Sequence, residues 1–378
     1  MGKLSALMCA ALLTLNACAM FGSEPADQAE AKAAVQPAAS LAAELQTVWG
    51  VNVDQRQPKT PFSYGAPVLA GDVIAVGAQD QRLHIYNMQG AELRRVALDA
   101  VSDSAALSMG HMVVLGDAQG MLYGIDVQQG SILWKLQLPS VMLGHPARVG
   151  EDMIVQTADN GIYRISAKGE KLWSFSGPAS GLSMHLSPSP LMVGDVCYAV
   201  MSNGDALALR SDSGDLLWRR QLLIDNDAVV LSELKAPLAD PVLIDGILIV
   251  SLYQGDVVGI SARDGQQLWQ RTLSLKSTPL VHDGHLFAST SSGAVLELEA
   301  STGASLWKQK LDAGELVGPA LYQSRLYVAD DRGQAFALSQ AGKPIARLSL
   351  PGRVDRAPVA TPEGVLLRNN LGGLYLIR

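Results

Sequence analysis

Cysteine and clustered positive charge are both scarce in this chain, and each shortage excludes a class of protein. Among 378 residues there are only three cysteines, and no pair has the CxxC spacing of a zinc or redox site. The 29 Lys and Arg residues are scattered, and 36 Asp and Glu give a net charge of −7, which argues against a nucleic-acid-binding surface. The GxGxxG, P-loop, GxSxG and HExxH motifs are absent as well, so no common cofactor site or hydrolase centre is indicated.

Long apolar runs are missing except at the very start. Lys3 precedes the apolar run Leu4–Leu15, which is too short to span a bilayer and is typical of a secretory signal peptide. The run ends in LNAC, which resembles a bacterial lipobox and predicts that residues 1–17 are removed and that Cys18 carries lipid. An ordinary cleaved signal, with Cys18 as a bystander, is the alternative. Cys197, in the strand-like stretch DVCYAV, then has no partner and is expected to be a buried, inert thiol.

The segment from residue 18 to residue 45 has no strand pattern. It is rich in Ala, Glu and Gln and contains Pro25 and Pro37. We interpret it as a lipidated N-terminus and flexible tether, with a short helical piece near residues 39–45. The remaining residues, 46–378, form a periodic region.

Tryptophan is rare too, but its spacing is regular. Of the six tryptophans, five stand four residues after a glycine, as in DVQQGSILWK at residues 126–135. The glycine can adopt the left-handed conformation that a turn needs, and we expect the tryptophan to pack an outer strand between neighbouring repeats. The tryptophans with this spacing are Trp134, Trp173, Trp218, Trp269 and Trp307, and Trp49 lies near the start of the periodic region.

One period shows what each repeat builds. The stretch from Pro241 to Leu273 contains four short apolar-rich runs separated by turn signals. Asp245-Gly246 is a strong two-residue hairpin signal, and Gly255 and Gly265 mark the next two turns. The period therefore predicts a four-stranded antiparallel meander.

Two independent landmarks count the repeats, and both give eight periods of about 40 residues, the length of a propeller blade. An α-solenoid would need apolar residues at a spacing of 3.6, which these segments lack. Arg94 and Ala346 stand where tryptophan is expected. The turn before each third strand falls at Gln81, Gly120, Gly161, Gly204, Gly255, Gly293, Gly333 and Gly372, and each first strand opens at Pro67, Ala106, Pro146, Pro190, Pro241, Pro279, Pro319 and Pro358.

The two ends of the periodic region complement each other. The last period stops at GGLYLIR after its third strand, whereas residues 45–53, LQTVWGVNV, read as a fourth strand without its first three. We therefore predict an all-β, eight-bladed β-propeller in which the N-terminal strand completes the last blade and leaves no open sheet edge at the seam.

The motif GMLYGIDVQQGSILW, residues 120–134, resembles the PQQ-like propeller repeat. Eight such repeats behind a lipobox, in a chain of this length, resemble the BamB family of outer-membrane protein assembly factors. The resemblance implies a non-catalytic, cofactor-free scaffold, lipid-anchored to the outer membrane and facing the periplasm. It also implies binding to the periplasmic POTRA domains of BamA, to other subunits of the same machinery, and to unfolded outer-membrane proteins.

Two connections between repeats are longer than the others, and they should carry the partner site. They cover residues 176–190 and 222–241, and both link an outer strand to the next inner strand, so they should project from one face. By the resemblance, a Leu-x-Leu-Arg segment in the first connection binds BamA. The matching residues are Leu182, Ser183, Met184 and His185, followed by the apolar Leu186. The alternative is that these apolar side chains tuck against the propeller itself. The acidic residues of the family's second loop align with Ala236 and Leu238, so that role is not carried over.

Two rival functions stay open on the sequence. A small quinone-linked periplasmic oxidoreductase would share the repeats, but the vicinal cysteine pair of quinoprotein dehydrogenases is missing. A propeller scaffold of another envelope complex is the second rival. The histidines of HDGH, residues 282–285, are better explained as turn residues than as metal ligands, and the DND at 225–227 lacks the Gly and Glu that a calcium loop needs. We expect no metal site.

Overall fold

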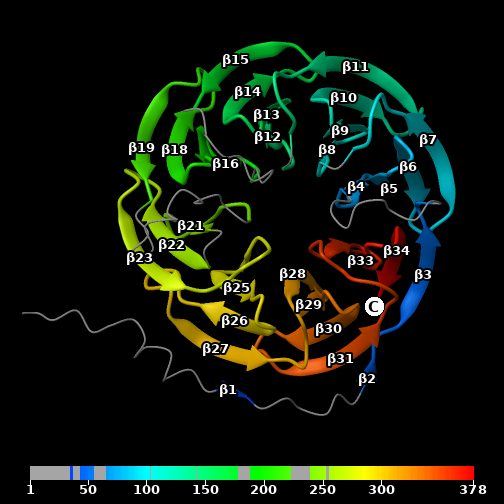
Figure 1. Cartoon of the computed structure of the whole chain (residues 1–378), viewed down its shortest axis with the longest axis vertical. Helices are drawn as coiled ribbons and strands as arrows, with labels where there is room; N and C mark the ends of the chain where they lie inside the picture. Colours follow the sequence, from blue (N-terminus) through cyan, green and yellow to red (C-terminus); the bar gives the residue numbers. More distant parts are fainter. Residues whose placement is uncertain are drawn as a thin grey trace, which may run out of the picture.

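The computed structural model describes residues 35–36, 43–54, 65–102, 104–142, 144–177, 188–222, 239–252 and 255–378. Over these residues the chain forms strands and no helix, and thus no helix with the length and apolar character of a membrane span. The strands form eight sheets arranged in a closed ring (Figure 1). The predicted all-β, eight-bladed propeller is confirmed.

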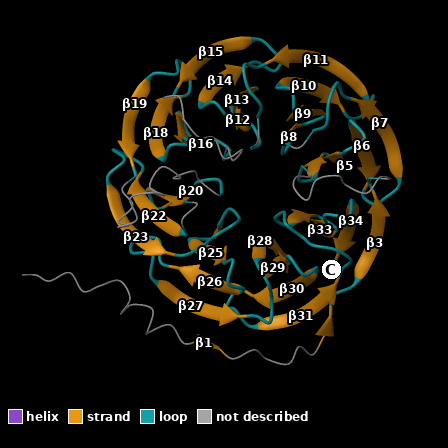
Figure 2. Ribbon diagram, viewed as in Figure 1, coloured by secondary structure: helices purple, strands orange, loops and turns teal. Residues whose placement is uncertain are grey.

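Each blade is an antiparallel meander whose strands follow one another from the axis of the ring to its rim (Figure 2). Blades 1 to 4 consist of β4 (Val68–Ala70), β5 (Val73–Gly77), β6 (Arg82–Asn87) and β7 (Glu92–Ala97); β8 (Leu107–Met109), β9 (Met112–Gly116), β10 (Met121–Asp126) and β11 (Ser131–Gln137); β12 (Ala147–Val149), β13 (Asp152–Gln156), β14 (Gly161–Ile165) and β15 (Lys171–Ser176); and β16 (Leu191–Val193), β17 (Val196–Val200), β18 (Asp205–Arg210) and β19 (Leu216–Gln221).

Blades 5 to 8 repeat this order. They consist of β20 (Val242–Ile244), β21 (Ile247–Ser251), β22 (Asp256–Ser261) and β23 (Gln267–Thr272); β24 (Leu280–His282), β25 (His285–Ser289), β26 (Ala294–Leu298) and β27 (Ser305–Lys310); β28 (Leu316–Tyr322), β29 (Arg325–Asp330), β30 (Gln334–Ser339) and β31 (Pro344–Ser349); and β32 (Val359–Thr361), β33 (Gly364–Arg368), β34 (Gly373–Ile377) and β3 (Thr47–Asn52).

The predicted closure is present in blade 8, where β3 pairs antiparallel with β34. A buried ion pair lies beside it: Arg368 donates to Asp54, which follows β3, across 3.1 Å, and both side chains are 1% exposed. The same guanidinium donates to the carbonyls of Gly65 and Gly77 in blade 1. One arginine therefore joins the C-terminal blade, the N-terminal strand and the first blade.

The hairpin turns agree with the sequence signals, with one correction. Asp245 and Gly246 both have positive φ, 49° and 76°, as the predicted two-residue turn requires. Asp283 and Gly284 adopt the same conformation, which supports the reading of HDGH as a turn. In blade 3, however, the left-handed residue before the third strand is Asn160 rather than Gly161. Asparagine tolerates positive φ better than most residues, so it serves in place of glycine.

The apolar core is divided among the junctions between blades. Each of the eight buried clusters combines residues of two neighbouring blades, and together they cover every junction in the ring. A blade therefore buries its two faces only because it has a neighbour on each side. Burial of this kind ties the stability of each sheet to closure of the ring.

The tryptophans contact the next blade, not their own turn glycine. The indole of Trp134 in blade 2 lies against Gly169 in blade 3, where an added Cβ would be only 2.6 Å from the ring. Its Nε1–H donates to the carbonyl of Ala167 across 2.9 Å. The same contact joins the tryptophans of blades 3 to 6 and of blade 8 to the turn glycine of the following blade. Only Trp218 is buried, at 8% exposure, and the other five are half-buried.

The two positions that lack tryptophan have different explanations. Arg94 in blade 1 lies on Gly130 of blade 2, in the place of an indole. Blade 8 has no turn before its outer strand, because β3 comes from the N-terminus, so blade 7 has no turn glycine to contact. Ala346 instead packs in one buried cluster with Leu45. The small alanine leaves room for the N-terminal segment.

Two short strands that precede β3 in the sequence lie on the outside of the ring (Figure 1). Of these, β1 (Val35–Gln36) pairs parallel with β27 of blade 6, and β2 (Ala43–Glu44) pairs parallel with β31 of blade 7. The helical piece predicted near residues 39–45 is therefore wrong for Ala43 and Glu44. Two blades are extended to five strands, because an outer strand offers unpaired backbone groups to any extended chain beside it.

Candidate docking face

The residues predicted to bind a partner lie outside the described part of the chain. This applies to Leu182, Ser183, Met184, His185 and Leu186, and also to the predicted lipidation site, Cys18. Most of the second long connection lies outside it as well. The ends of both connections are described, and they define where the two loops enter the ring.

These ends are joined by a chain of hydrogen bonds that passes from blade to blade. The backbone N–H of His145 donates to Ser189 Oγ across 2.9 Å, and the N–H of Ser189 donates to Asp240 Oδ1 across 2.6 Å. The N–H of Asp240 donates in turn to Thr278 Oγ1 across 3.2 Å. Ser189 ends the first long connection and Asp240 ends the second, so the two loops have adjacent, mutually fixed bases.

A charged pair reinforces this chain of hydrogen bonds. The imidazole Nε2 of His145 lies 3.3 Å from Asp240 Oδ2, with side chains 46% and 28% exposed. Burial alone lowers the pKa of His145, but the hydrogen bond and the charge of Asp240 outweigh it and raise the pKa above its usual value. For Asp240, burial favours the neutral acid, yet the pKa is lowered because His145 and Ser189 donate to the carboxylate.

Sequence reasoning missed this chain of hydrogen bonds because its successive members are 38 to 51 residues apart, far beyond the range of local patterns. His145 in particular shows no ligand spacing in the sequence. A signal was nevertheless available: each of the four residues immediately precedes the proline that opens a first strand. Aligning the repeats on these prolines would have placed the four side chains at equivalent positions.

Among the described residues, the other histidines and Cys197 belong to no metal-binding cluster. Cys197 is buried, and burial raises the pKa of its thiol to about 12, as expected for an unreactive core residue. His282 pairs with Asp283 of its own turn, and His285 pairs with Glu297. Within the described ranges, no three His, Cys, Asp or Glu side chains converge in a way that could hold a metal ion.

A closed ring of eight four-stranded blades with a regular glycine–tryptophan contact defines a propeller of the PQQ-like-repeat class. The chain belongs to the family described as outer membrane protein assembly factor BamB, whose model matches residues 39–309 and 291–376. Relatives of that name include proteins from Bordetella pertussis, 26% identical over 99% of this chain and 96% of the relative, and Nitrosomonas eutropha, 26% identical over 94% and 87%.

Solved structures agree on the fold. BamB from Moraxella catarrhalis has a TM-score of 0.75 at 18% identity, covering 88% of this chain and 99% of that one. The computationally designed Ika8 protein has a TM-score of 0.71 at 14% identity, covering 86% and 98%. Because a designed protein shares the architecture so fully, the fold alone does not assign a function.

Proposed function

We propose that this chain is a non-catalytic scaffold subunit of the machinery that assembles β-barrel proteins in the outer membrane. The observation that carries the proposal is the family match, which spans nearly the whole periodic region. Relatives aligned over most of the chain share the name of an assembly factor. A scaffold acts by presenting a surface, and a propeller whose long loops enter side by side suits that role.

The proposed docking surface consists of the two long loops, and the proposed partner is the periplasmic POTRA region of BamA. In support, the hydrogen bond between Ser189 and Asp240 fixes the ends of the two connections next to each other. Anchoring these ends in advance would lower the ordering cost of binding. Cys18 would carry the lipid that keeps the protein at the outer membrane, facing the periplasm.

The experiment compares the double variant Leu182→Ala/Met184→Ala with wild type for affinity to purified BamA POTRA domains and for melting temperature. Truncating an interface anchor costs about 1–3 kcal/mol of binding, so affinity should fall at least tenfold with an unchanged melting temperature. The control is Trp218→Ala, which should lower the free energy of unfolding by about 3–5 kcal/mol. Unchanged affinity with a lowered melting temperature would mean that the loop packs on its own propeller.

A second test addresses the anchor. Cys18→Ser should leave the protein without lipid, and in cells lacking BamA it should then fractionate with soluble periplasmic proteins. Stable anchoring needs more than one acyl chain, which a lipidated N-terminal cysteine supplies. Retention of the unlipidated variant in the outer membrane would contradict the assignment.

A further inference from the structure

The outer strands present unpaired backbone groups around the rim of the ring, and the chain itself covers two of these edges. Blade 6 is extended by β1 and blade 7 by β2, whereas β3, β7, β11, β15, β19 and β23 are each the outermost strand of a four-stranded sheet within the described residues. An unpaired edge is a template for any extended chain. The occupied edges therefore show what kind of segment a free edge can accept.

In blade 7 the side chains of the added segment alternate. Glu44 pairs with Arg347 and is exposed. The next residue, Leu45, is 3% exposed and packs in one cluster with Ala346. Its N–H donates to the carbonyl of Arg347 across 3.0 Å, so this carbonyl points away from its own blade. The occupant thus places a polar side chain toward solvent and an apolar one against the core.

The equivalent residue in blade 3 is Ser174. The N–H of Gly177 and that of Leu350 each donate to the carbonyl of the left-handed turn residue of their own blade, and Ser174 and Arg347 lie three residues earlier. Backbone groups point alternately to the two sides of a strand. Ser174 and Ser176 therefore direct their N–H and carbonyl groups to the free edge of β15.

Charge distinguishes this edge from most of the others. A basic residue occupies the position of Ser174 in five blades, and in blades 1, 2 and 4 it pairs with a nearby carboxylate. Charged side chains along an edge strand discourage the addition of a neutral strand. The basic residues are Arg95, Lys135, Arg219, Lys308 and Arg347, and the uncharged ones are Ser174, Gln270 and Gly50.

The two faces of β15 differ in polarity. Trp173 and Phe175 are half-buried and pack against the cluster shared by blades 3 and 4. Ser174 and Ser176, which point to the other face, are exposed. Because successive side chains of a strand alternate between faces, an added strand has one row beside two aromatic rings and the other beside two hydroxyl groups.

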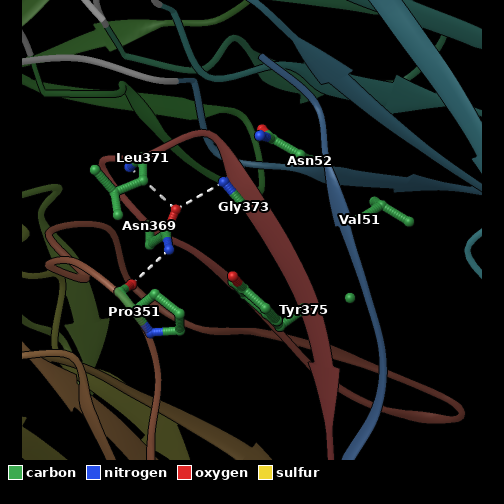
Figure 3. Close-up of a pocket in the computed structure, with 8 residues that line it drawn as sticks. Val51, Asn52, Pro351, Asn369, Leu371, Gly373 and Tyr375 are labelled. Atoms are coloured by element: carbon green, nitrogen blue, oxygen red, sulfur yellow. Dashed lines mark hydrogen bonds between the residues drawn. The ribbon is translucent and has the colours of Figure 1, made fainter. Parts of the chain in front are cut away.

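The other two uncharged edges are less complete. In blade 5 Gln270 is followed by Arg271, which interrupts the apolar row. In blade 8 a hollow of about 330 Å³ opens beside Gly50, with Tyr375 and Leu371 in its wall (Figure 3). A strand added there would lie over empty space on one face. Blade 3 therefore offers the most continuous surface for an additional strand.

We propose that the free edge of β15 binds an extended segment of a partner protein in which apolar and uncharged polar residues alternate. The segment adds a fifth strand to blade 3, as β2 does to blade 7. Backbone hydrogen bonds to Ser174 and Ser176 hold it in place. Its apolar side chains cover Trp173 and Phe175, and its polar side chains face solvent. The site is a sheet edge, so it rests neither on the two long loops nor on the function proposed for them.

The test uses the intact chain and a fluorescein-labelled peptide of eight residues that alternates valine and serine. A second peptide has the same composition arranged as four valines followed by four serines. Fluorescence anisotropy should show saturable binding of the alternating peptide and about tenfold weaker binding of the block peptide, which cannot match both faces of the edge. Hydrogen exchange should slow at the amides of Ser174 and Ser176 when the alternating peptide binds, because pairing protects them.

Three variants make the outcome decisive. Ser174→Pro removes an N–H that faces the edge but none that pairs with β14, so it should weaken binding at least tenfold with little change in melting temperature. Gln270→Pro makes the same change in blade 5 and should bind the peptide like wild type. Ser174→Arg keeps the backbone N–H and should prefer, by up to about fivefold, a peptide with glutamate in place of serine, as Arg347 faces Glu44. No saturable binding by wild type, equal affinities for the valine–serine peptides, or unaltered binding by Ser174→Pro would overturn the proposal.

Discussion

The six tryptophans occupy equivalent positions, yet their indole N–H groups differ. Trp218 is the most buried, and its Nε1–H donates to the carbonyl of Ala262 across 3.0 Å. Trp307 lies on its glycine in the usual way, but its buried Nε1 has no hydrogen-bond partner among the described residues. An unpaired buried donor costs free energy, so this residue is less favourable than its counterparts.

We therefore expect Trp218→Phe and Trp307→Phe to differ in stability. The first loses a hydrogen bond worth about 1 kcal/mol as well as buried area, whereas the second removes an unsatisfied donor and should be nearly neutral. Urea unfolding midpoints of the two variants and wild type measure the difference. Equal losses would show that ring volume alone determines the contribution of these residues.

The pair of His145 and Asp240 predicts a pH dependence. The pKa of His145 is raised in the folded state. Its contribution to the free energy of unfolding is therefore fully present below the unfolded-state pKa, near 6.5, and is lost as the pH rises through the folded-state pKa. The lowered pKa of Asp240 keeps the carboxylate charged as the pH falls toward its usual range. The melting temperature of wild type should exceed that of His145→Gln by more at pH 5.5 than at pH 8.5.

The control for this experiment is His111→Gln, because His111 is exposed. That variant should track wild type at both pH values. A constant difference between His145→Gln and wild type across the range would show that the imidazole acts there by packing rather than by charge.

At the scale of strands and turns, the two exceptions to the tryptophan pattern offer a matched comparison. Arg94→Trp places an indole on Gly130, the same contact that tryptophans make with the turn glycines of other blades. This variant should be neutral or raise the melting temperature. Ala346→Trp forces the same group into the cluster that contains Leu45, and overpacking of this kind typically costs about 1–3 kcal/mol. Thermal unfolding of both variants tests this expectation. Similar effects at the two positions would disprove the role assigned to the N-terminal segment.

The elements themselves could be predicted because their signals are local. The turn at Asp245-Gly246 and the alternation of runs and turns fix a four-stranded unit, and counting such units gives the ring. Contacts between blades could not be predicted in this way. The glycine and tryptophan of one segment are four residues apart, but the glycine contacts the preceding blade and the tryptophan contacts the following one. The pairing of Ala43 with Ala346 likewise has no signature in either segment.

At the scale of the whole molecule, the ion pair of Asp54 and Arg368 fastens residues 314 positions apart in the sequence. Removing one partner of a buried pair leaves an uncompensated charge, so Arg368→Met should lower the free energy of unfolding by about 3–5 kcal/mol. The matched control is Lys276→Met, which breaks the exposed pair with Glu315 and should cost at most about 1 kcal/mol. Chemical denaturation of both variants measures the two costs, and comparable values would contradict a special role for the closing pair.

Closure by β3 also sets an order of events during synthesis. Because a chain is made from its N-terminus, β3 exists long before its partner β34 at residues 373–377 and cannot pair with it until that strand has been made. Blades 1 to 7 can be assembled in the meantime, but the ring closes only when these last residues are available. A chain that lacks β34 leaves β3 unpaired at the seam, so a closed ring reports that translation has run through to the final strand.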